Sequence, residues 1–362
     1  MRERDYYLGF SMAPGIGPKK FNLLLSNFGS AEKAWNASAS QLGPILKPAL
    51  TSKFLDFRRE FDFHKYQHQL KRQKISVITL SDKEYPEFLK QIPNPPIVLY
   101  IKGNIDLLSS RSNKIAIVGT RHITSYGRQI TEMFAGDLAR AGLVVVSGMA
   151  LGVDGVAHKA TIDSGGKTIA VLGNGVDTPY PRENEKLYEE ILDSGGAVVS
   201  EFPPGMPASV GSFPARNRIV AGLSHGVLVT EGASDSGSLI TANFGLEFGR
   251  KVFAVPGPIT SPLSKAPLDL IAKGARLVTS AADILKELNI QSSKSSKSNT
   301  SRKGDTKEEN SILKILENEP LNFDEIARLT KIDSSKLAGI LSMMEIKGMI
   351  KSLSSGAFSL AI

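Results

Sequence analysis

The sequence predicts an α/β protein built around a mostly parallel sheet with helices on both faces. Between Lys114 and about Leu288, short apolar runs alternate with stretches that have the periodicity of amphipathic helices. The runs expected to form strands are Ile115–Gly119, Leu143–Gly148, Thr168–Gly173, Ala197–Phe202, Gly226–Glu231 and Val252–Gly257. Strands that are apolar throughout are buried on both faces, as in parallel sheets. We therefore expect a doubly wound, Rossmann-like sheet.

The helices expected to cover this sheet lie between the apolar runs. They are Arg128–Gly142, Val153–Ser164, Glu183–Ser194, Pro214–Ser224 and Ser238–Gly249. Ligands of doubly wound sheets bind beyond the carboxyl ends of the strands, so the residues that follow each strand are the candidates for a site.

The composition of the 362 residues excludes several classes of protein. Hydrophobic residues make up 41% and charged residues 22%, a globular mixture that rules out a disordered or fibrous chain. Because the chain has no cysteine, it has no disulfide, iron–sulfur cluster or cysteine nucleophile. It has no run of about 18 apolar residues, and its N-terminus lacks the apolar core of a signal peptide. We therefore expect a cytoplasmic protein with no membrane partner.

The net charge of +8 lies outside the expected sheet. Residues 1–72 contain 12 Lys and Arg against 6 Asp and Glu, whereas residues 73–290 contain 21 of each kind. Residues 291–306 contain four basic residues and one acidic residue, and residues 307–362 contain seven and eight. These shifts indicate four segments: an N-terminal bundle at 1–72, the sheet domain at 73–290, a linker at 291–306 and a C-terminal domain at 307–362.

The linker prediction rests on composition. Residues 291–306 have no hydrophobic side chain, so no burial offsets the entropy cost of ordering them. A disordered, solvated spacer is favoured, and the alternative is transient contact of its basic residues with nucleic acid.

The expected carboxyl ends of four strands carry small and polar residues. Gly119–Arg121 follows the first strand, Ser147–Asp154 the second, Gly173–Asp177 the third and Glu231–Ala242 the fifth. Glycine lets the backbone approach a ligand closely, and helix N-termini offer unpaired N–H groups. Small residues also permit tight turns, and for any single turn that simpler explanation is preferred. Four such turns together with Arg121 favour a phosphate-binding rim.

Nucleotide motifs and catalytic sets are missing from this rim. Gly119 does not open the G-x-G-x-x-G fingerprint of a dinucleotide site, and the chain has no P-loop lysine motif. His64 and His68 have the i,i+4 spacing of a helical metal site but no carboxylate to complete it, so we expect no metal. Asp154 and His158 are spaced like an acid/base pair, but a helix cap and a hydrogen-bonded histidine are favoured. We expect no catalytic residue and no cofactor.

An aromatic residue and two arginines occur together in the segment FPARNR. Phe213 precedes a proline that is expected to begin a helix, and Arg216 and Arg218 lie in its first turn. Cations oppose the dipole at a helix N-terminus, so a bound phosphate would explain them better than local stability. An aromatic beside arginines suits single-stranded nucleic acid. The alternative is that the arginines hold Glu201 or Glu231, and we expect one arginine to be structural and the other to face a ligand.

These residues belong to a set of segments that resembles the DprA/Smf family of DNA-processing proteins. The matching segments, in chain order, are YPEFLKQIPNPPIVLYIKG, IAIVGTR, SGMALGVDGVAHKAT, GGKTIAVLGNGVDTPYPREN, GGAVVSEFPPG, FPARNRIVAGLS, EGASDSGSLITANFGLEFGR and VFAVPGPI. They fall between about Ser81 and Leu288. The resemblance implies a Rossmann-like domain that binds single-stranded DNA, protects incoming strands in natural transformation and loads the RecA recombinase onto them. It also implies a homodimer formed through this domain and no enzymatic activity.

The resemblance also implies which residues bind DNA. Arg121 matches an arginine that grips a phosphate, Lys167 a basic residue that lines the same groove, and Phe213 an aromatic placed against a base. The remaining matches are the backbone rim and the FPARNR motif, that is Gly119, Thr120, Ser147, Gly148, Arg216, Asn217 and Arg218. Two positions depart from some members of the family, because Val210 and Leu151 stand where those members carry basic residues.

The flanking segments are expected to be mostly helical. Residues 1–72 predict a SAM-like bundle, in which Gly15–Lys19 has the form of a helix-hairpin-helix turn whose amides can bind a phosphate. A plain connecting turn is the alternative. Residues 307–362 predict three helices and a hairpin, with Asp333 or Ser334 capping the third helix, and resemble a winged-helix domain. The third helix offers at most two lysines, so a protein-interaction or regulatory role is favoured over binding of duplex DNA.

Two other functions stay open at this point. A nucleotide-processing enzyme similar to nucleoside-monophosphate glycosidases would use the same fold, with Glu201 and Glu231 as its carboxylates. The P-G-G-x-G-T-x-x-E motif of those enzymes is not matched by Glu231–Gly237. A regulator of duplex DNA would act through the winged helix instead.

Overall fold

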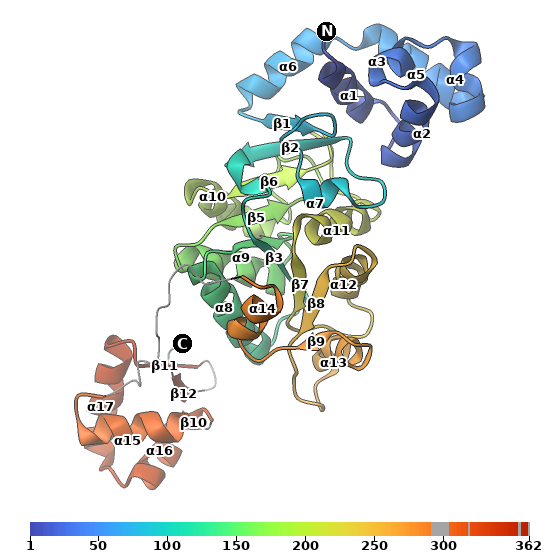
Figure 1. Cartoon of the computed structure of the whole chain (residues 1–362). Coiled ribbons are helices and arrows are strands. Elements are labelled where there is room, and N and C mark those ends of the chain that lie inside the picture. The colour runs from blue at the N-terminus through green and yellow to red at the C-terminus, as the bar shows by residue number, and fades with distance from the viewer. Residues whose placement is uncertain (291–303, 318, 354–355, 361–362) are drawn as a thin grey trace. The chain divides into compact units, whose positions relative to one another are not determined.

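The computed structural model describes residues 1–290, 304–317, 319–353 and 356–360. The chain divides into two compact units, Met1–Ser293 and Lys294–Ile362 (Figure 1). Most of the predicted linker, residues 291–303, lies outside the described residues. Across the described part of the chain, no helix is both long enough and apolar enough to cross a membrane.

The first unit is centred on a nine-stranded sheet whose interior is parallel, as predicted. The strand order is β1-β2-β6-β5-β4-β3-β7-β8-β9. The strands are β1 (Ser76–Thr79), β2 (Val98–Gly103), β3 (Lys114–Val118), β4 (Val144–Ser147), β5 (Thr168–Val171), β6 (Ala197–Ser200), β7 (Gly226–Val229), β8 (Lys251–Ala254) and β9 (Arg276–Leu277). Every pair from β6 across to β9 is parallel. The chain reverses its direction of winding between β3 and β7, which is where doubly wound sheets bind ligands.

Three strands of this sheet were not predicted from the sequence: β9 at one edge, and β1 and β2 at the other. Strand β2 pairs in antiparallel fashion with both β1 and β6, so the sheet is mixed at this edge. Four of the six residues of β2 are buried. Strands β1 and β2 precede the repeating strand–helix units, so that repeat does not predict their pairing.

Helices cover both faces of the sheet (Figure 1). One face carries α8 (Ser125–Arg140), α9 (Val153–Asp163), α10 (Glu185–Asp193) and α14 (Ala281–Glu287), and the other carries α7 (Glu87–Lys90), α11 (Ser212–Leu223), α12 (Gly237–Glu247) and α13 (Lys265–Ala272). On β3, Ile115 and Ile117 join the core of the first face, and Ala116 and Val118 join that of the second. Each fully buried aliphatic side chain of Val or Ile size contributes about 1.5–3 kcal/mol. This two-sided burial explains why the strands are apolar throughout.

Six helices precede the sheet and pack around aromatic side chains. They are α1 (Glu3–Met12), α2 (Pro18–Phe28), α3 (Ala31–Asn36), α4 (Ala39–Leu46), α5 (Pro48–Glu60) and α6 (Phe63–Arg72). The rings of Phe10 and Trp35 meet edge to face with their centroids 5.2 Å apart. The hydroxyl of Tyr100 on β2 lies 2.7 Å from that of Ser11 and 3.1 Å from that of Tyr66. These bonds tie the helices to the edge of the sheet.

The second unit has the helix and strand order of a winged helix. Its elements are α15 (Lys307–Leu316), β10 (Leu321–Asn322), α16 (Phe323–Thr330), α17 (Ser334–Ile346), β11 (Ile350–Ser352) and β12 (Ala357–Leu360). The strands form an antiparallel sheet in the order β10-β12-β11. Asp333 caps α17, because its side chain accepts the N–H of Ser335 at 3.0 Å. Strand β10 has only two residues and was not predicted.

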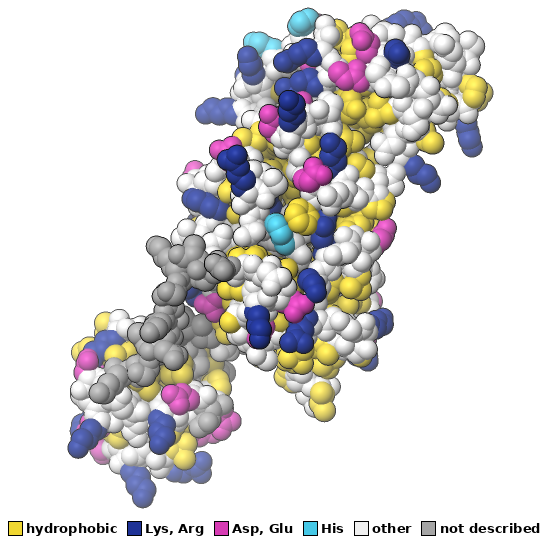
Figure 2. All heavy atoms as spheres, viewed as in Figure 1, with side chains coloured by type: hydrophobic (Ala, Val, Ile, Leu, Met, Phe, Trp, Pro, Cys, Tyr) yellow, Lys and Arg dark blue, Asp and Glu magenta, His cyan; other side chains and the backbone are white. Residues whose placement is uncertain are grey.

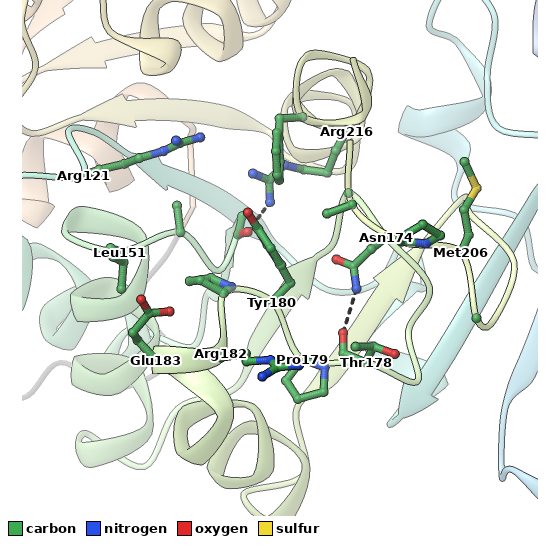
Figure 3. Close-up of a pocket in the computed structure, with 18 residues that line it drawn as sticks. Arg121, Leu151, Asn174, Thr178, Pro179, Tyr180, Arg182, Glu183, Met206 and Arg216 are labelled. Carbon is green, nitrogen blue, oxygen red and sulfur yellow. Dashed lines mark hydrogen bonds between the residues drawn. The ribbon is translucent and has the colours of Figure 1, made fainter. Parts of the chain in front are cut away.

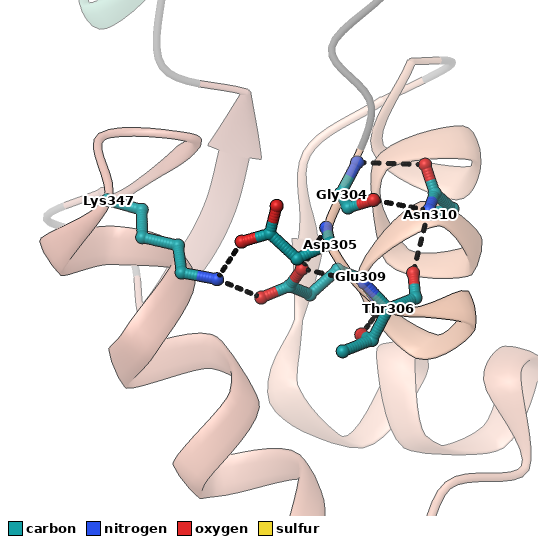
Figure 4. Close-up of polar contacts among 6 residues, drawn as sticks. All are labelled: Gly304, Asp305, Thr306, Glu309, Asn310 and Lys347. Carbon is teal, nitrogen blue, oxygen red and sulfur yellow. Dashed lines mark hydrogen bonds and ion pairs between the residues drawn. The ribbon is translucent and has the colours of Figure 1, made fainter.

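An ion-pair network fixes the start of this unit to the end of α17 (Figure 4). The Nζ of Lys347 lies 2.7 Å from Oδ2 of Asp305 and 2.8 Å from Oε1 of Glu309. Glu309 is buried, and its Oε2 also accepts the N–H of Thr306 at 3.1 Å. The hydrogen bond from Lys347 holds the pKa of Glu309 below its usual range. The ammonium of Lys347 therefore bonds within the unit.

Replacing Lys347 by methionine should loosen the second unit, because it leaves the buried carboxylate of Glu309 without its cation. The lowered pKa of Glu309 stabilises the fold above the pKa of the unfolded state, and this stabilisation is lost as the pH falls through the folded-state pKa. We expect K347M to exchange the amide hydrogens of α15 several-fold faster at pH 7, with a smaller difference near pH 4. The exposed Lys314→Met is the control. Equal exchange in K347M and the parent at pH 7 would contradict this role.

Candidate nucleic-acid interface

The predicted rim surrounds a cavity of about 760 Å³ at the carboxyl ends of β4 and β5 (Figure 3). The polar and aromatic side chains on its wall include Arg121, Asn174, Tyr180, Arg182, Phe213 and Arg216. A second cavity of about 660 Å³ lies beside it, at the crevice between β3 and β7. The two cavities share Arg121 and Phe213, so these side chains stand where the cavities meet.

Arg216 is buried beneath the rim. Its Nη1 donates to the carbonyl oxygens of Gly148, after β4, and Val171, at the end of β5. Asp154 lies in the same layer, and its Oδ2 accepts the N–H groups of Gly148 at 3.1 Å and Ala150 at 3.3 Å. Burial raises the pKa of Asp154, and the charge of Arg216 offsets part of that rise. Arg216 thus joins two strand ends from within.

Glycines allow the turns of the rim to pack on one another. A Cβ on Gly148 would collide with the guanidinium of Arg216. Gly152 has a φ of +75°, and a Cβ there would collide with the carbonyl oxygen of Thr120. At these two positions the close approach is to the protein itself, which is the simpler of the two explanations offered for the glycine-rich turns.

Several backbone amides of the rim are bonded to the protein. The N–H of Thr120 donates to the carbonyl of Glu231 at 2.8 Å, and that of Gly148 donates to Asp154. The hydroxyl of Ser147 donates to the carbonyl of Ile117 at 2.6 Å. Gly119, Thr120, Ser147 and Gly148 therefore shape the rim through backbone packing.

Arg218 lies away from the cavity and pairs with Glu201, and both side chains are largely buried. Burial raises the pKa of Glu201, against the opposing effect of Arg218. The carboxylate of Glu231 instead accepts the N–H and hydroxyl of Thr124, at 3.0 and 2.6 Å, and so caps α8. The ion pair of Arg218 with Glu201 confirms the alternative that an arginine of the motif holds this carboxylate. Arg216 lines both cavities, and its Nη1 bonds to protein groups. Asn217 is on the surface and its Nδ2 lies 3.4 Å from the carbonyl oxygen of Gly237.

Among the predicted cations, Arg121 is the exposed one that lines the cavity. Its guanidinium lies 5.7 Å from the ring centroid of Phe213. The ring of Tyr180 lies 5.5 Å from the same ring, tilted by 32°. Within the described residues, the side chain of Arg121 forms no hydrogen bond or ion pair. The structure therefore brings a free guanidinium and two aromatic rings together at one point of the rim.

Lys167 is not brought to this point. It precedes β5, and its ammonium donates to the carbonyl of Ser194, which follows α10. Because β5 runs toward the rim, a residue before it lies at the opposite edge of the sheet. Lys167 and Arg121 therefore do not line one groove in this structure, in contrast to what the family resemblance implied.

Of the possible acid/base pair beneath the rim, the histidine takes the hydrogen-bonded form that the sequence favoured, but the prediction that Asp154 caps its helix is wrong. The N-cap of α9 is Gly152, and Asp154 instead accepts the N–H groups of Gly148 and Ala150 from the preceding turn. His158 is fully buried, and its Nδ1 lies 2.6 Å from the hydroxyl of Thr168. Burial lowers the pKa of His158 to about 3, so its imidazole is neutral at pH 7. Within the described ranges, no group of three or more histidine and acidic side chains could hold a metal ion.

Sequence reasoning placed Asn174 in the Gly173–Asp177 turn of the rim without singling it out, and it missed Tyr180 and Arg182 as residues of this cavity. Arg182 is exposed and its side chain has no hydrogen bond or ion pair within the described ranges. In Figure 3, Tyr180 lies between Arg121 and Arg182. The segment TPYPREN follows the third predicted strand directly, so an aromatic and a cation just after a strand end were the available signal.

The chain matches two family models. One, described as DNA recombination-mediator protein A, matches residues 76–289, and the other, the DprA winged helix domain, matches residues 296–356. The chain is 41% identical over 265 residues to the DNA processing protein DprA of Bacillus subtilis, which is 71% of this chain and 89% of that protein. It is 43% identical over 248 residues to protein Smf of Escherichia coli, which is 68% of this chain and 65% of that protein.

Two solved structures are similar to the chain. The X-ray structure of DNA processing protein A from Streptococcus pneumoniae has a TM-score of 0.67 and 36% identity, over 78% of this chain and 97% of that one. A structure that gives insights into the single-stranded DNA binding mode of DNA processing protein A from Helicobacter pylori has a TM-score of 0.54 and 31% identity, over 60% and 96%. The chain therefore belongs to the DprA/Smf family of DNA-processing proteins, as its sequence motifs predicted.

Proposed function

We propose that this chain binds single-stranded DNA, with little sequence preference, at the rim formed by β3, β4, β5 and α11. The observation that carries the proposal is Arg121, a free guanidinium held against the ring of Phe213. A cation and an aromatic side by side match the two groups that every nucleotide of a single strand exposes, the phosphate and the face of a base. The single-stranded DNA binding described for the relative from Helicobacter pylori supports the proposal.

Arg182 supplies a second free cation on the same wall. We propose that Arg121 and Arg182 contact phosphates, whereas Arg216 keeps the loops between them in place. Val210 and Leu151, which stand where some family members carry basic residues, are both exposed. The phosphate contacts of this chain therefore depend on few cations.

We further propose that the bound strand is protected and passed to the RecA recombinase in the cytoplasm, during natural transformation or recombination. Membership of the DprA/Smf family supports this step. We also propose a homodimer formed through the Rossmann-like domain. Leu246 on α12 is 51% exposed and Ile259 after β8 is 89% exposed, and such apolar side chains favour contact with a second copy.

Neither alternative function gains support from the site. The enzyme alternative needs two available carboxylates, but Glu201 is paired with Arg218 and Glu231 caps α8. A duplex-DNA regulator needs free cations on α17, but Lys336 pairs with Glu308 and Lys347 with Asp305 and Glu309. We therefore favour a non-enzymatic protein without a cofactor, in which the winged helix serves protein interaction or regulation. Contact of the Gly15–Lys19 turn with DNA stays a prediction.

Reversing the charge of Arg121 should weaken binding of single-stranded DNA at least about tenfold, by a similar factor for different sequences. The lost contact is to a phosphate, which is the same in every sequence. Arg111→Glu, an exposed arginine before β3 at the opposite edge of the sheet, makes the same charge change as a control. The measurement is fluorescence anisotropy with labelled oligonucleotides of several sequences. Equal affinity of R121E and R111E would mean that the rim is not the binding site.

Replacing Arg216 by methionine should act on stability first. The change leaves the carbonyl oxygens of Gly148 and Val171 without their donor, and each buried unsatisfied group costs about 1–3 kcal/mol. We expect the first unit to unfold at lower denaturant concentration, whereas the exposed Arg121→Glu should unfold as the parent does. An unchanged unfolding midpoint for R216M would contradict the structural role of this arginine.

Ending the chain before Lys294 should leave the affinity for single-stranded DNA within about twofold of the full chain, because the rim lies entirely in the first unit. The same truncation should leave the affinity for duplex DNA unchanged, because we expect the full chain to bind duplex DNA only weakly. The measurement compares the affinities of the full chain and of the truncated chain for single-stranded and duplex DNA at one salt concentration. A large loss of duplex binding on truncation would favour the regulator alternative.

A further inference from the structure

A groove of about 620 Å³ lies between the N-terminal helices and the β1 edge of the sheet. Its walls come from α1, α6, β1 and the start of η1 (Ile105–Leu108). No described residue lines both this groove and either cavity of the rim, and strands β2 and β6 separate β1 from β5. The groove is therefore a separate surface of the first unit.

Three basic side chains of α6 line the groove without a partner. His64, His68 and Lys71 recur at i, i+4 and i+7, which places them on one side of the helix. All three are exposed, and within the described residues none of their side chains forms a hydrogen bond or ion pair. Figure 2 shows histidine, lysine and arginine side chains gathered over α6 and the start of α1. The groove therefore presents N–H donors that the protein itself does not use.

The acidic side chains at the groove are already bonded to the protein. Asp5 is the only acidic residue among the described ones that line it, and it is buried. Its Oδ1 accepts Nε2 of Gln67 at 2.8 Å, and its Oδ2 accepts the N–H of Arg2 at 2.8 Å. Asp82 pairs with Arg4, another residue of the wall, at 3.3 Å. The three basic side chains of α6 are thus left to bind anionic groups from outside.

Side chains close the edge of β1 to a further strand. The guanidinium of Arg4 donates to the carbonyl oxygen of Val77 at 3.0 Å, and Oδ2 of Asp82 accepts the N–H of Thr79 at 2.8 Å. These are backbone groups that an added strand would need. A partner in the groove is therefore held by its side chains.

Apolar side chains form the base of the groove. Leu8, Leu70 and Ile75 are buried there, and Val77 and Ile105 are half-buried. Of the described residues that line the groove, none is Phe, Tyr or Trp, whereas sites for single-stranded nucleic acid use such rings for stacking. Basic side chains beside an apolar base match a peptide that carries both carboxylates and apolar side chains.

We propose that this groove docks an acidic peptide segment of a protein partner. The carboxylates of the peptide bond to His64, His68 and Lys71, and its apolar side chains cover the base of the groove. An imidazole donates at least one N–H whether it is neutral or protonated, so both histidines can serve. The partner can bind while the rim holds DNA, because the two surfaces share no described residue. The inference does not depend on the proposed binding of single-stranded DNA.

Selection from a phage-displayed library of random short peptides tests this docking surface. The bait is the full chain with oligo-thymidine in excess, so that acidic peptides do not occupy the rim. We expect the selected peptides to be enriched in Asp and Glu, with apolar residues between them. A library that yields no binder, or only binders without acidic residues, would overturn the proposal.

Charge reversal on α6 locates the bound peptide. Lys71→Glu should bind a selected, fluorescently labelled peptide at least about fivefold more weakly, because an attraction becomes a repulsion. Lys71→Arg, which keeps the charge, should bind within about twofold of the parent. Arg72→Glu is the matched control, because Arg72 is exposed in the same turn of α6 and does not line the groove. Equal affinities of K71E and R72E for the peptide would overturn the site.

Binding of DNA by the same variants separates this inference from the proposed function. We expect K71E and R72E to bind oligo-thymidine and duplex DNA alike, and R121E to bind the peptide as the parent does. If K71E weakens binding of DNA but not of the peptide, the groove takes nucleic acid and the docking proposal is wrong. If K71E weakens binding of the peptide while R121E changes neither affinity, the groove stands and the rim is wrong.

Discussion

The geometry of the rim depends on the buried guanidinium of Arg216. It bridges the carbonyl oxygens at the ends of β4 and β5, and it can do so only because Gly148 has no side chain to occupy its place. Helix α11, which carries Arg216 inward, carries Phe213 at its start, where the ring meets Arg121. One helix thus fixes the strand ends from below and presents an aromatic surface above them. The amides of Thr120, Gly148 and Ala150 bond to the protein, so at these positions the exposed chemistry of the rim comes from side chains.

The fold class and the family could be predicted because two-sided burial forces apolar strands and because the motifs follow the strand ends in order. Arg121 and Phe213 could also be predicted as residues of the rim. Arg121 directly follows the end of a strand, and Phe213 stands at the start of a helix that faces the strand ends. The ion pair of Arg218 with Glu201 was one of the predicted alternatives. Which of the two arginines would form it was not predicted, because a position in the first turn of a helix does not say which way a long side chain points. The place of Lys167 was predicted wrongly, because a residue that precedes a strand running toward the rim lies at the opposite edge of the sheet. Strands β1 and β2 were not predicted because they pair in antiparallel fashion outside the parallel repeat, and β9 was not predicted because it has only two residues.

The net charge of +8 gives a poor guide to the site. The sheet domain is neutral, and the two free cations on its cavity wall are set among arginines that bond internally. In the winged helix, Lys336 and Lys347 are paired with carboxylates, which leaves α17 with little positive charge to offer duplex DNA. We therefore propose that affinity for a polyanion depends on where cations are left unpaired, and that the excess charge of residues 1–72 aids encounter more than it defines the site.

The central claim is that the rim recognises single strands through a few phosphate contacts and exposed aromatic rings. Competition of unlabelled duplex and single-stranded DNA against a labelled single strand, at two salt concentrations, tests it most directly. Single strands should compete far better than duplex of the same length, and affinity should fall with salt by the small slope of about two phosphate contacts. Equal competition by duplex at both salt concentrations would contradict it.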